Sequence, residues 1–159
     1  MKKIFSVSTL TLASALVLAA CGSSEEATES SESAASEGGL QDGTYTLVEK
    51  NLDENGWKTD FSITVKGGEI TESNYENVNE AGDKKSEDEA YQERMSEVSG
   101  VGPVEYFPQL NEQLVETQDP AAVEVVTGAT HSSESFKEYA QQLVDAAEEG
   151  NTDTIEIDN

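Results

Sequence analysis

Basic residues, cysteine and histidine are all scarce in this sequence. It holds 9 Lys and Arg against 33 Asp and Glu, a formal net charge of −24 at pH 7. Such a surface repels nucleic acid, so we expect no nucleic-acid partner. The one cysteine, Cys21, has no partner for an intrachain disulfide. The one histidine, His131, lies in a polar segment without a fixed acid partner, which favours a solvated ring over a catalytic one.

The N-terminus has the pattern of an export signal. Two lysines precede an apolar run from about Val7 to Ala20, which is too short to span a membrane as a helix. We therefore predict a signal peptide over residues 1–20. Its end, LAACG, resembles the lipobox at which bacterial lipoprotein precursors are acylated and cleaved. The resemblance implies that Cys21 carries a lipid such as palmitate and anchors the mature chain, of net charge −26, to the outer side of the cell membrane.

Residues 21–40 are predicted to be the lipidated cysteine and a flexible linker. The stretch GSSEEATESSESAASEGG contains no large apolar residue and cannot offset the entropy lost on ordering. A flexible chain of roughly 20 residues reaches about 25 Å on average and about 65 Å when stretched. We predict one folded domain over residues 41–150 and a C-terminal tail over 151–159.

The first half of the domain has the two-residue period of β-strands. Apolar residues alternate with polar ones at Tyr45 and Leu47, and again at Phe61, Ile63 and Val65. Asn55-Gly56 and Gly67-Gly68 supply tight turns, and a third strand-like run extends from Ile70 to Val78. Three antiparallel strands are expected.

The second half changes to a helical period. Ser86 and Glu89 form a capping-box pattern, and a short amphipathic helix ending at Gly100 is expected to follow. Its apolar face holds Tyr91, Met95 and Val98. A second helix is predicted after Pro103 and through about Thr117, with apolar positions at Phe107, Leu110 and Leu114. Pro108 is tolerated near its start, and Asp119-Pro120 ends it.

A strand and a third helix are predicted for the rest of the domain. Val123, Val125 and Val126 are β-branched and favour a brief strand. The last helix has the clearest period, with Gly150 as its C-terminal cap. Its apolar positions are Phe136, Tyr139, Ala140, Leu143, Val144 and Ala147. The pattern predicts an α+β fold, a small antiparallel sheet packed by two or three amphipathic helices.

The most informative residues lie between that strand and that helix. Gly128 and Ala129 permit close approach to the backbone, and Thr130 presents a hydroxyl at the start of the helix. The free N–H groups of a first helical turn, with the hydroxyls of Ser132 and Ser133 beside them, suit a phosphate. An ordinary helix N-cap is the alternative interpretation of these residues.

The run Thr127-Gly128-Ala129-Thr130, followed by Ser132-Ser133, resembles the Ser/Thr-Gly-Ala-Thr signature of the FMN-binding domain family. Members include flavin-carrying subunits of sodium-pumping NADH:quinone oxidoreductases and small lipoproteins of extracellular electron transfer. The resemblance implies that Thr130 is joined to FMN through a phosphoester, made by a flavin transferase that uses FAD and a divalent metal. Thr127, Gly128 and Ala129 would then form its approach, with Ser132 and Ser133 at the phosphate.

The chain departs from the family pattern at one position. Glu124 stands six residues before Thr130, where the family usually has Asp. The charge is kept on a longer side chain, which places the efficiency of flavin attachment in question. Several residues are candidates to pack against the flavin ring, although core packing is the more frequent role of such residues: Trp57, Tyr91, Met95, Tyr106 and Phe107.

The resemblance implies an electron-transfer flavoprotein more than a substrate-specific enzyme. Electrons would pass from a membrane quinol or NADH dehydrogenase to an extracellular acceptor such as ferric iron. Two alternatives stay open at this point: the electron-input module of an extracellular flavin reductase, and a non-catalytic acidic surface lipoprotein. Acid clusters such as Glu87-Asp88-Glu89 lack the spacing of a calcium loop, so no metal ligands are assigned.

Overall fold

The computed structural model describes residues 39–159. The predicted signal peptide 1–20, the lipidation site Cys21 and the linker up to residue 38 lie outside the described residues. The described elements are β1 (Gly43–Glu49), β2 (Lys58–Lys66), β3 (Glu69–Val78), the 3₁₀ helix η1 (Lys85–Glu87), α1 (Glu89–Ser99), α2 (Pro103–Thr117), the 3₁₀ helix η2 (Pro120–Ala122), α3 (Thr130–Glu149) and β4 (Ile155–Ile157). Within residues 39–159, no helix has the length and apolar character that crossing a membrane requires.

The sheet has the strand order β3-β2-β1-β4. The three predicted antiparallel strands are confirmed: β1 pairs with β2, and β2 with β3 through a two-residue turn in which Gly67 and Gly68 both have positive φ. The short strand β4 was not predicted. It pairs parallel to β1, with Ile155 opposite Leu47, so the sheet is mixed.

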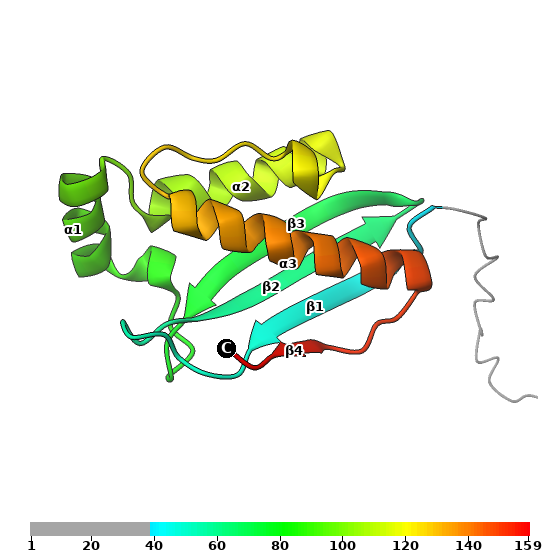
Figure 1. The fold of residues 1–159 in the computed structure, drawn as a ribbon, viewed down its shortest axis with the longest axis horizontal. Helices are drawn as coiled ribbons and strands as arrows, with labels where there is room; N and C mark the ends of the chain where they lie inside the picture. The colour runs from blue at the N-terminus through cyan, green and yellow to red at the C-terminus, as the bar shows by residue number, and fades with distance from the viewer. Residues whose placement is uncertain (1–38) are drawn as a thin grey trace, which may run out of the picture. The chain divides into compact units, whose positions relative to one another are not determined.

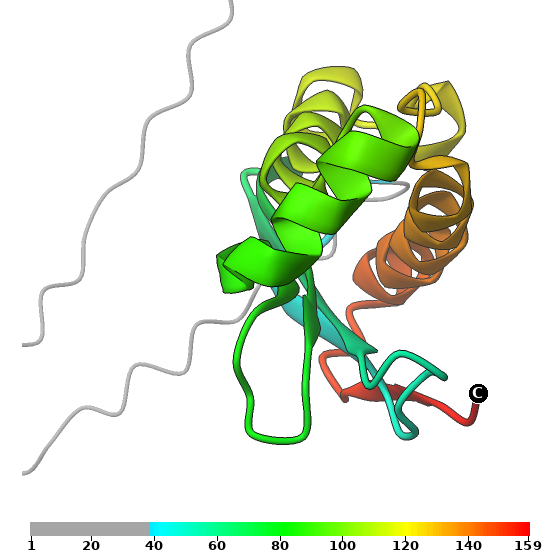
Figure 2. The ribbon, with the colours of Figure 1, turned by 90° about the vertical axis from the view of Figure 1, so that its left-hand side faces the viewer.

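Helices α2 and α3 lie on the same side of the sheet (Figure 1), and Figure 2 shows them side by side with α1 at one end. The α+β fold class is thereby confirmed. The inward residues of the strands and the apolar faces of α2 and α3 form one core. The opposite face of the sheet carries polar residues such as Asp60, Ser62 and Asn74 and is solvated.

Side-chain amides of α2 and of its C-terminal cap residue cover the backbone edge of β3. The Asn111 side chain accepts a hydrogen bond from Tyr75 N at 2.8 Å and donates to Tyr75 O at 3.3 Å. Two turns further on, Gln118 pairs in the same way with Ile70, at 2.7 and 2.8 Å. An exposed strand edge invites pairing with other chains, and these amides occupy it.

The predicted boundaries of α2 and α3 agree with the structure. Pro103 stands at the first position of α2, where its missing N–H costs nothing. The apolar positions predicted for α3 are all buried, and Gly150 adopts the left-handed conformation at its C-terminal cap.

The prediction for α1 is wrong in two respects. The N-cap is Asp88, whose carboxylate accepts from Tyr91 N, while Ser86 Oγ donates to Glu76 at 2.5 Å. No residue of α1 is buried, and Val98 is 78% exposed. The reason is position: α1 packs on α2 and η1 and not on the sheet, so its apolar residues meet no core.

The brief strand predicted at residues 123–126 is also wrong, because this segment forms a loop. Val123 and Val126 are buried, which explains the β-like composition. Backbone N–H groups of this segment donate to side chains and not to a neighbouring strand. Gln113 Oε1 accepts from Glu124 N at 2.7 Å, and Ser133 Oγ accepts from Val126 N at 3.0 Å.

Candidate functional site

A tight turn leads the chain into α3. Ala129 N donates to Val126 O at 2.9 Å, and Gly128 has φ +89°, which a side chain rarely adopts. A Cβ at Gly128 would also lie 2.3 Å from the carbonyl oxygen of Ser99, the last residue of α1. Glycine is therefore required here on two grounds, conformation and close backbone approach.

Ser133 fixes this turn to the helix. Its side chain is fully buried, accepts from Val126 N at 3.0 Å and donates to Ala129 O at 2.8 Å. The hydroxyl is thus already used inside the protein. This leaves Ser133 as a support of the turn and not as a group that faces solvent.

Thr130 is the first residue of α3, and it is exposed. The N-cap residue Ala129 has no side-chain acceptor, and helix geometry leaves the N–H groups of Thr130, His131 and Ser132 without an intrahelical partner. The positive end of the helix dipole lies at the same place. A phosphate oxygen could accept from these groups while its ester oxygen belonged to Thr130.

Ser132 is half-buried and lies near the hydroxyl of Tyr106 on α2. Burial raises the pKa of Tyr106 to about 12, and the neighbouring Ser132 side chain opposes that rise. The contact joins the first turn of α3 to α2.

A cavity of about 260 Å³ begins beside this first turn. It lies between α3 and one end of the sheet, where the inward face changes from apolar to polar. Glu49 on β1, Thr59 on β2 and Asn77 on β3 line it together. The other lining residues are Asp53, Trp57, Tyr75, Lys85, His131, Ser132, Ser135, Tyr139 and Asn159.

Glu49 on β1 is hydrogen-bonded to both β2 and α3, which form two walls of this cavity. One carboxylate oxygen accepts from Thr59 N at 2.7 Å, and the other accepts from the Tyr139 hydroxyl at 2.6 Å. Burial and the hydrogen bond to Glu49 raise the pKa of Tyr139, so its hydroxyl stays a donor.

Lys85 is the one charged residue among the buried residues of the described chain, with 7% of its surface exposed. Its Nζ lies 4.6 Å from the centre of the Tyr91 ring and 5.7 Å from that of Trp57. Such cation–π contacts partly replace lost hydration.

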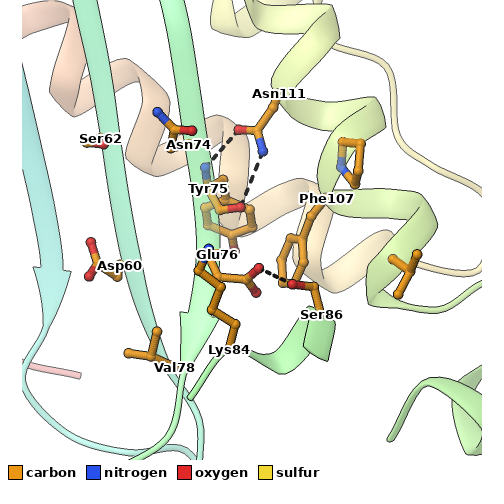
Figure 3. Close-up of a pocket in the computed structure, with 12 residues that line it drawn as sticks. Asp60, Ser62, Asn74, Tyr75, Glu76, Val78, Lys84, Ser86, Phe107 and Asn111 are labelled. Atoms are coloured by element: carbon orange, nitrogen blue, oxygen red, sulfur yellow. Dashed lines mark hydrogen bonds between the residues drawn. The ribbon is translucent and has the colours of Figure 1, made fainter. Parts of the chain in front are cut away.

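A larger groove of about 500 Å³ lies around the edge of β3 (Figure 3). It exposes Glu76 with its partner Ser86, and Asn111 above Phe107. No residue of segment 124–133 lines it. This groove is larger than the cavity beside α3, but the exposed Thr130 hydroxyl, the free N–H groups of α3 and the Lys85 ammonium lie at or next to the smaller cavity, where we place the site.

The structure brings some of the predicted residues together and separates others. Thr127 is exposed and Ala129 buried at either side of Gly128. The Glu124 carboxylate is exposed and makes no hydrogen bond with a described residue. Of the candidate ring-packing residues, Trp57 lines the cavity and stacks edge-on with Tyr91 at 5.9 Å, Tyr106 and Phe107 belong to the core, and Met95 is half-buried on α1.

Sequence reasoning missed Glu49, Thr59, Asn77 and Lys85. The first three had a signal in the sequence. Each lies two residues from a buried residue and therefore on the same face of its strand: Glu49 after Leu47, Thr59 before Phe61 and Asn77 after Tyr75. Lys85 had none, because its burial depends on the packing of η1. Within residues 39–159, no group of three His, Cys, Asp or Glu is placed to hold a metal ion.

Comparison with known proteins gives a consistent result. Residues 56–145 match the model of a family described as FMN-binding domain. The chain is 37% identical over 116 residues to the 15 kDa lipoprotein of Treponema pallidum (strain Nichols), covering 73% of this chain and 82% of that protein. It is also similar to the crystal structure of the CPE2226 protein from Clostridium perfringens, with a TM-score of 0.72 and 44% identity over 76% of this chain and 98% of that one.

Proposed function

Because this chain belongs to the FMN-binding domain family and takes FMN as its cofactor, we propose that it carries FMN covalently on Thr130 and transfers electrons at the outer side of a cell membrane. The donor would be a membrane quinol or NADH dehydrogenase, and the acceptor ferric iron or another extracellular oxidant. The observation that carries the proposal is the exposed Thr130 hydroxyl beside the free N–H groups of α3.

The residues at the head of α3 fit a phosphate ester. The N–H groups of the first turn offset negative charge in a protein that is otherwise strongly acidic. Ser133 and Gly128 hold the turn in place, and Ser132 follows Thr130 by two residues in the first turn of α3. These residues bind and orient, whereas FMN itself supplies the capacity to accept and release one or two electrons.

Attachment requires a transferase and FAD as co-substrate. Thr130 Oγ1 would form a bond to the phosphorus of the FMN half of FAD. The pyrophosphate bond breaks, AMP leaves, and the hydroxyl proton passes to the transferase. The exposed position of Thr130 suits this step, because a second protein must reach the hydroxyl.

We further propose that the chain is a lipoprotein anchored through Cys21. The supporting observations are the LAACG sequence after the apolar run and the similarity to a Treponema pallidum protein named as a lipoprotein. A Cys21→Ala variant is expected in the soluble fraction of its host with unchanged flavin content. Retention of this variant in the membrane would contradict the anchor.

Intact mass spectrometry tests the attachment. The protein is produced with and without a flavin transferase, and a gain of one FMN minus water, on the peptide that contains Thr130, is expected only with the transferase. Thr130→Val keeps the β-branched shape but removes the hydroxyl, so this variant should stay colourless while folding normally. Thr152→Val is the matched control, since Thr152 is exposed and lies outside the site. Flavin retained by Thr130→Val after denaturation would assign the ester elsewhere.

Electron transfer is tested on the loaded protein. Protein that carries FMN is reduced with dithionite, desalted and mixed with ferric citrate under argon, and its flavin should be reoxidised. Protein without attached FMN, treated in the same way, should reduce no ferric citrate. Native material that proves colourless, with the Thr130 peptide unmodified, would leave the non-catalytic surface lipoprotein as the better explanation.

A further inference from the structure

The cavity beside Thr130 is lined by a cation without an anionic partner, Lys85. Two ion pairs form among residues 39–159, Lys50 with Glu156 and Lys66 with Glu72, and neither involves Lys85. The ammonium of Lys85 donates no hydrogen bond to any residue in the described part of the chain, and although only 7% of the residue is exposed, its nitrogen is not closed off from solvent. An ammonium that lines a cavity without an ion-pair partner can interact with a ligand that enters there.

The acidic groups around the cavity do not neutralise Lys85. Both oxygens of Glu49 accept other hydrogen bonds, and Asp53 Oδ1 accepts from the N–H groups of Asn55 and Trp57. Neither carboxylate lies within 4 Å of Lys85 Nζ, the distance that defines an ion pair among the described residues. The positive charge is therefore available to a ligand in the cavity.

The walls of the cavity suit an aromatic ligand that reaches in from Thr130. Trp57, Tyr75 and Tyr139 present aromatic surface, and His131 and Ser132 of the first turn of α3 stand at its border. A group esterified to Thr130 would begin next to this opening. The flavin ring system is such a group, and its reduction by two electrons with uptake of one proton adds one negative charge to the ring.

We propose that the cavity receives the flavin ring and that Lys85 raises its reduction potential, because the ammonium stabilises the reduced ring, which is more negative, over the oxidised ring. The proposal rests on attachment at Thr130. Tyr91 and Trp57 hold the ammonium in place, and a ring that fills the cavity would exclude water from between the two charges and so strengthen the effect. Lys85 is in this sense a residue that sets the electrostatics of the cofactor.

The test compares Lys85 with its neighbour. Lys84 is exposed and lines the larger groove, so Lys84→Met makes the same charge change outside the cavity. Lys85→Met is expected to lower the equilibrium constant for flavin reduction at least tenfold, about 30 mV in the two-electron midpoint potential. Lys84→Met should leave the potential unchanged, and Lys85→Arg should retain it. Lys85→Gln serves if the Met variant does not fold.

Trp57 provides a readout that does not depend on electron transfer. It is the only tryptophan, so its indole N–H gives a single side-chain signal in an ¹H–¹⁵N spectrum. Attachment of FMN should shift this signal through the ring current of the flavin. An unshifted signal in fully loaded protein would overturn the placement of the ring.

Each remaining outcome has one meaning. Equal shifts in potential for Lys84→Met and Lys85→Met would indicate a general charge effect and overturn the role of Lys85. If Lys85→Met carried less FMN but its loaded fraction kept the parent potential, the ammonium would interact with the phosphate and not with the ring. That result would also overturn the proposed effect of Lys85 on the reduction potential. Absence of any mass gain in the parent protein refutes the proposed attachment itself, and intact mass identifies that case separately.

Discussion

Replacing Ser133 by alanine tests whether one buried hydroxyl holds the turn that presents Thr130. The substitution removes the bond to Val126 N at 3.0 Å and the bond to Ala129 O at 2.8 Å. Ala129 O keeps its bond from Ser133 N at 2.9 Å, so only Val126 N loses its single partner. A buried donor without a partner costs about 1–3 kcal/mol, and we expect the free energy of unfolding to fall by about 2 kcal/mol.

Urea denaturation followed by circular dichroism measures this loss, and the thermal midpoint should fall by roughly 8 °C for a domain of this size. Ser135→Ala is the matched control. Ser135 lies two residues further on α3, is half-buried, and its hydroxyl makes no hydrogen bond with a described residue. The control should change the free energy of unfolding by less than about 0.5 kcal/mol. If Ser133→Ala were as mild as the control, the hydroxyl would not be what fixes the turn.

Three further predictions concern other parts of the fold. Gly128→Ala should cost about 2 kcal/mol or more, because the left-handed backbone alone costs about 1–2 kcal/mol and the new Cβ would overlap a backbone carbonyl; a variant as stable in urea as the parent would contradict this. Gln118→Ala should cost about 1–2 kcal/mol and speed amide hydrogen exchange at Ile70, whose N–H it leaves unpaired; unchanged protection at Ile70 would show that the edge of β3 does not depend on this amide. Burial raises the pKa of Tyr75, Tyr106 and Tyr139 above their unfolded value of 10, so above pH 10 the unfolded chain loses these protons first. The stabilisation is complete below pH 10 and decreases as pH rises towards 12, and urea midpoints that stayed constant over this range would refute the assignment.

The elements that could be predicted from sequence are those whose period alone decides their structure. In α3, buried positions recur every three or four residues over five turns, and a glycine ends the helix. Its bounds and its buried face can therefore be predicted without knowledge of the neighbouring elements. The strands β1 to β3 likewise show two-residue alternation and a Gly67-Gly68 turn.

The failures share one physical cause, partners that are distant in the chain. Val123 and Val126 look like strand residues because they are buried, but side chains of α2 and α3 satisfy the segment between them. Strand β4 has only three residues and gains its pairing from β1, more than 100 residues earlier. Helix α1 packs away from the core, so its amphipathic pattern buries none of its residues, although Tyr91 contacts Trp57.

The site was predictable in its motif and not in its surroundings. Thr130 was placed correctly at the head of a helix because local signals mark such a position. The cavity beside it combines residues from three strands, η1 and α3, and only the folded chain brings Lys85 to Trp57.

Helix α3 also acts as a rigid spacer of fixed length. Gln41, where the chain enters the domain, is hydrogen-bonded to Ala147 and Glu148 at one end of the helix, whereas Thr130 stands at the other. Twenty residues of helix separate these ends by about 30 Å. The Thr130 hydroxyl therefore stands at the end of the domain remote from the point where the chain enters it. With the flexible linker predicted for residues 21–40, an anchored domain would turn freely, so this end would face the membrane at one moment and the surrounding medium at another.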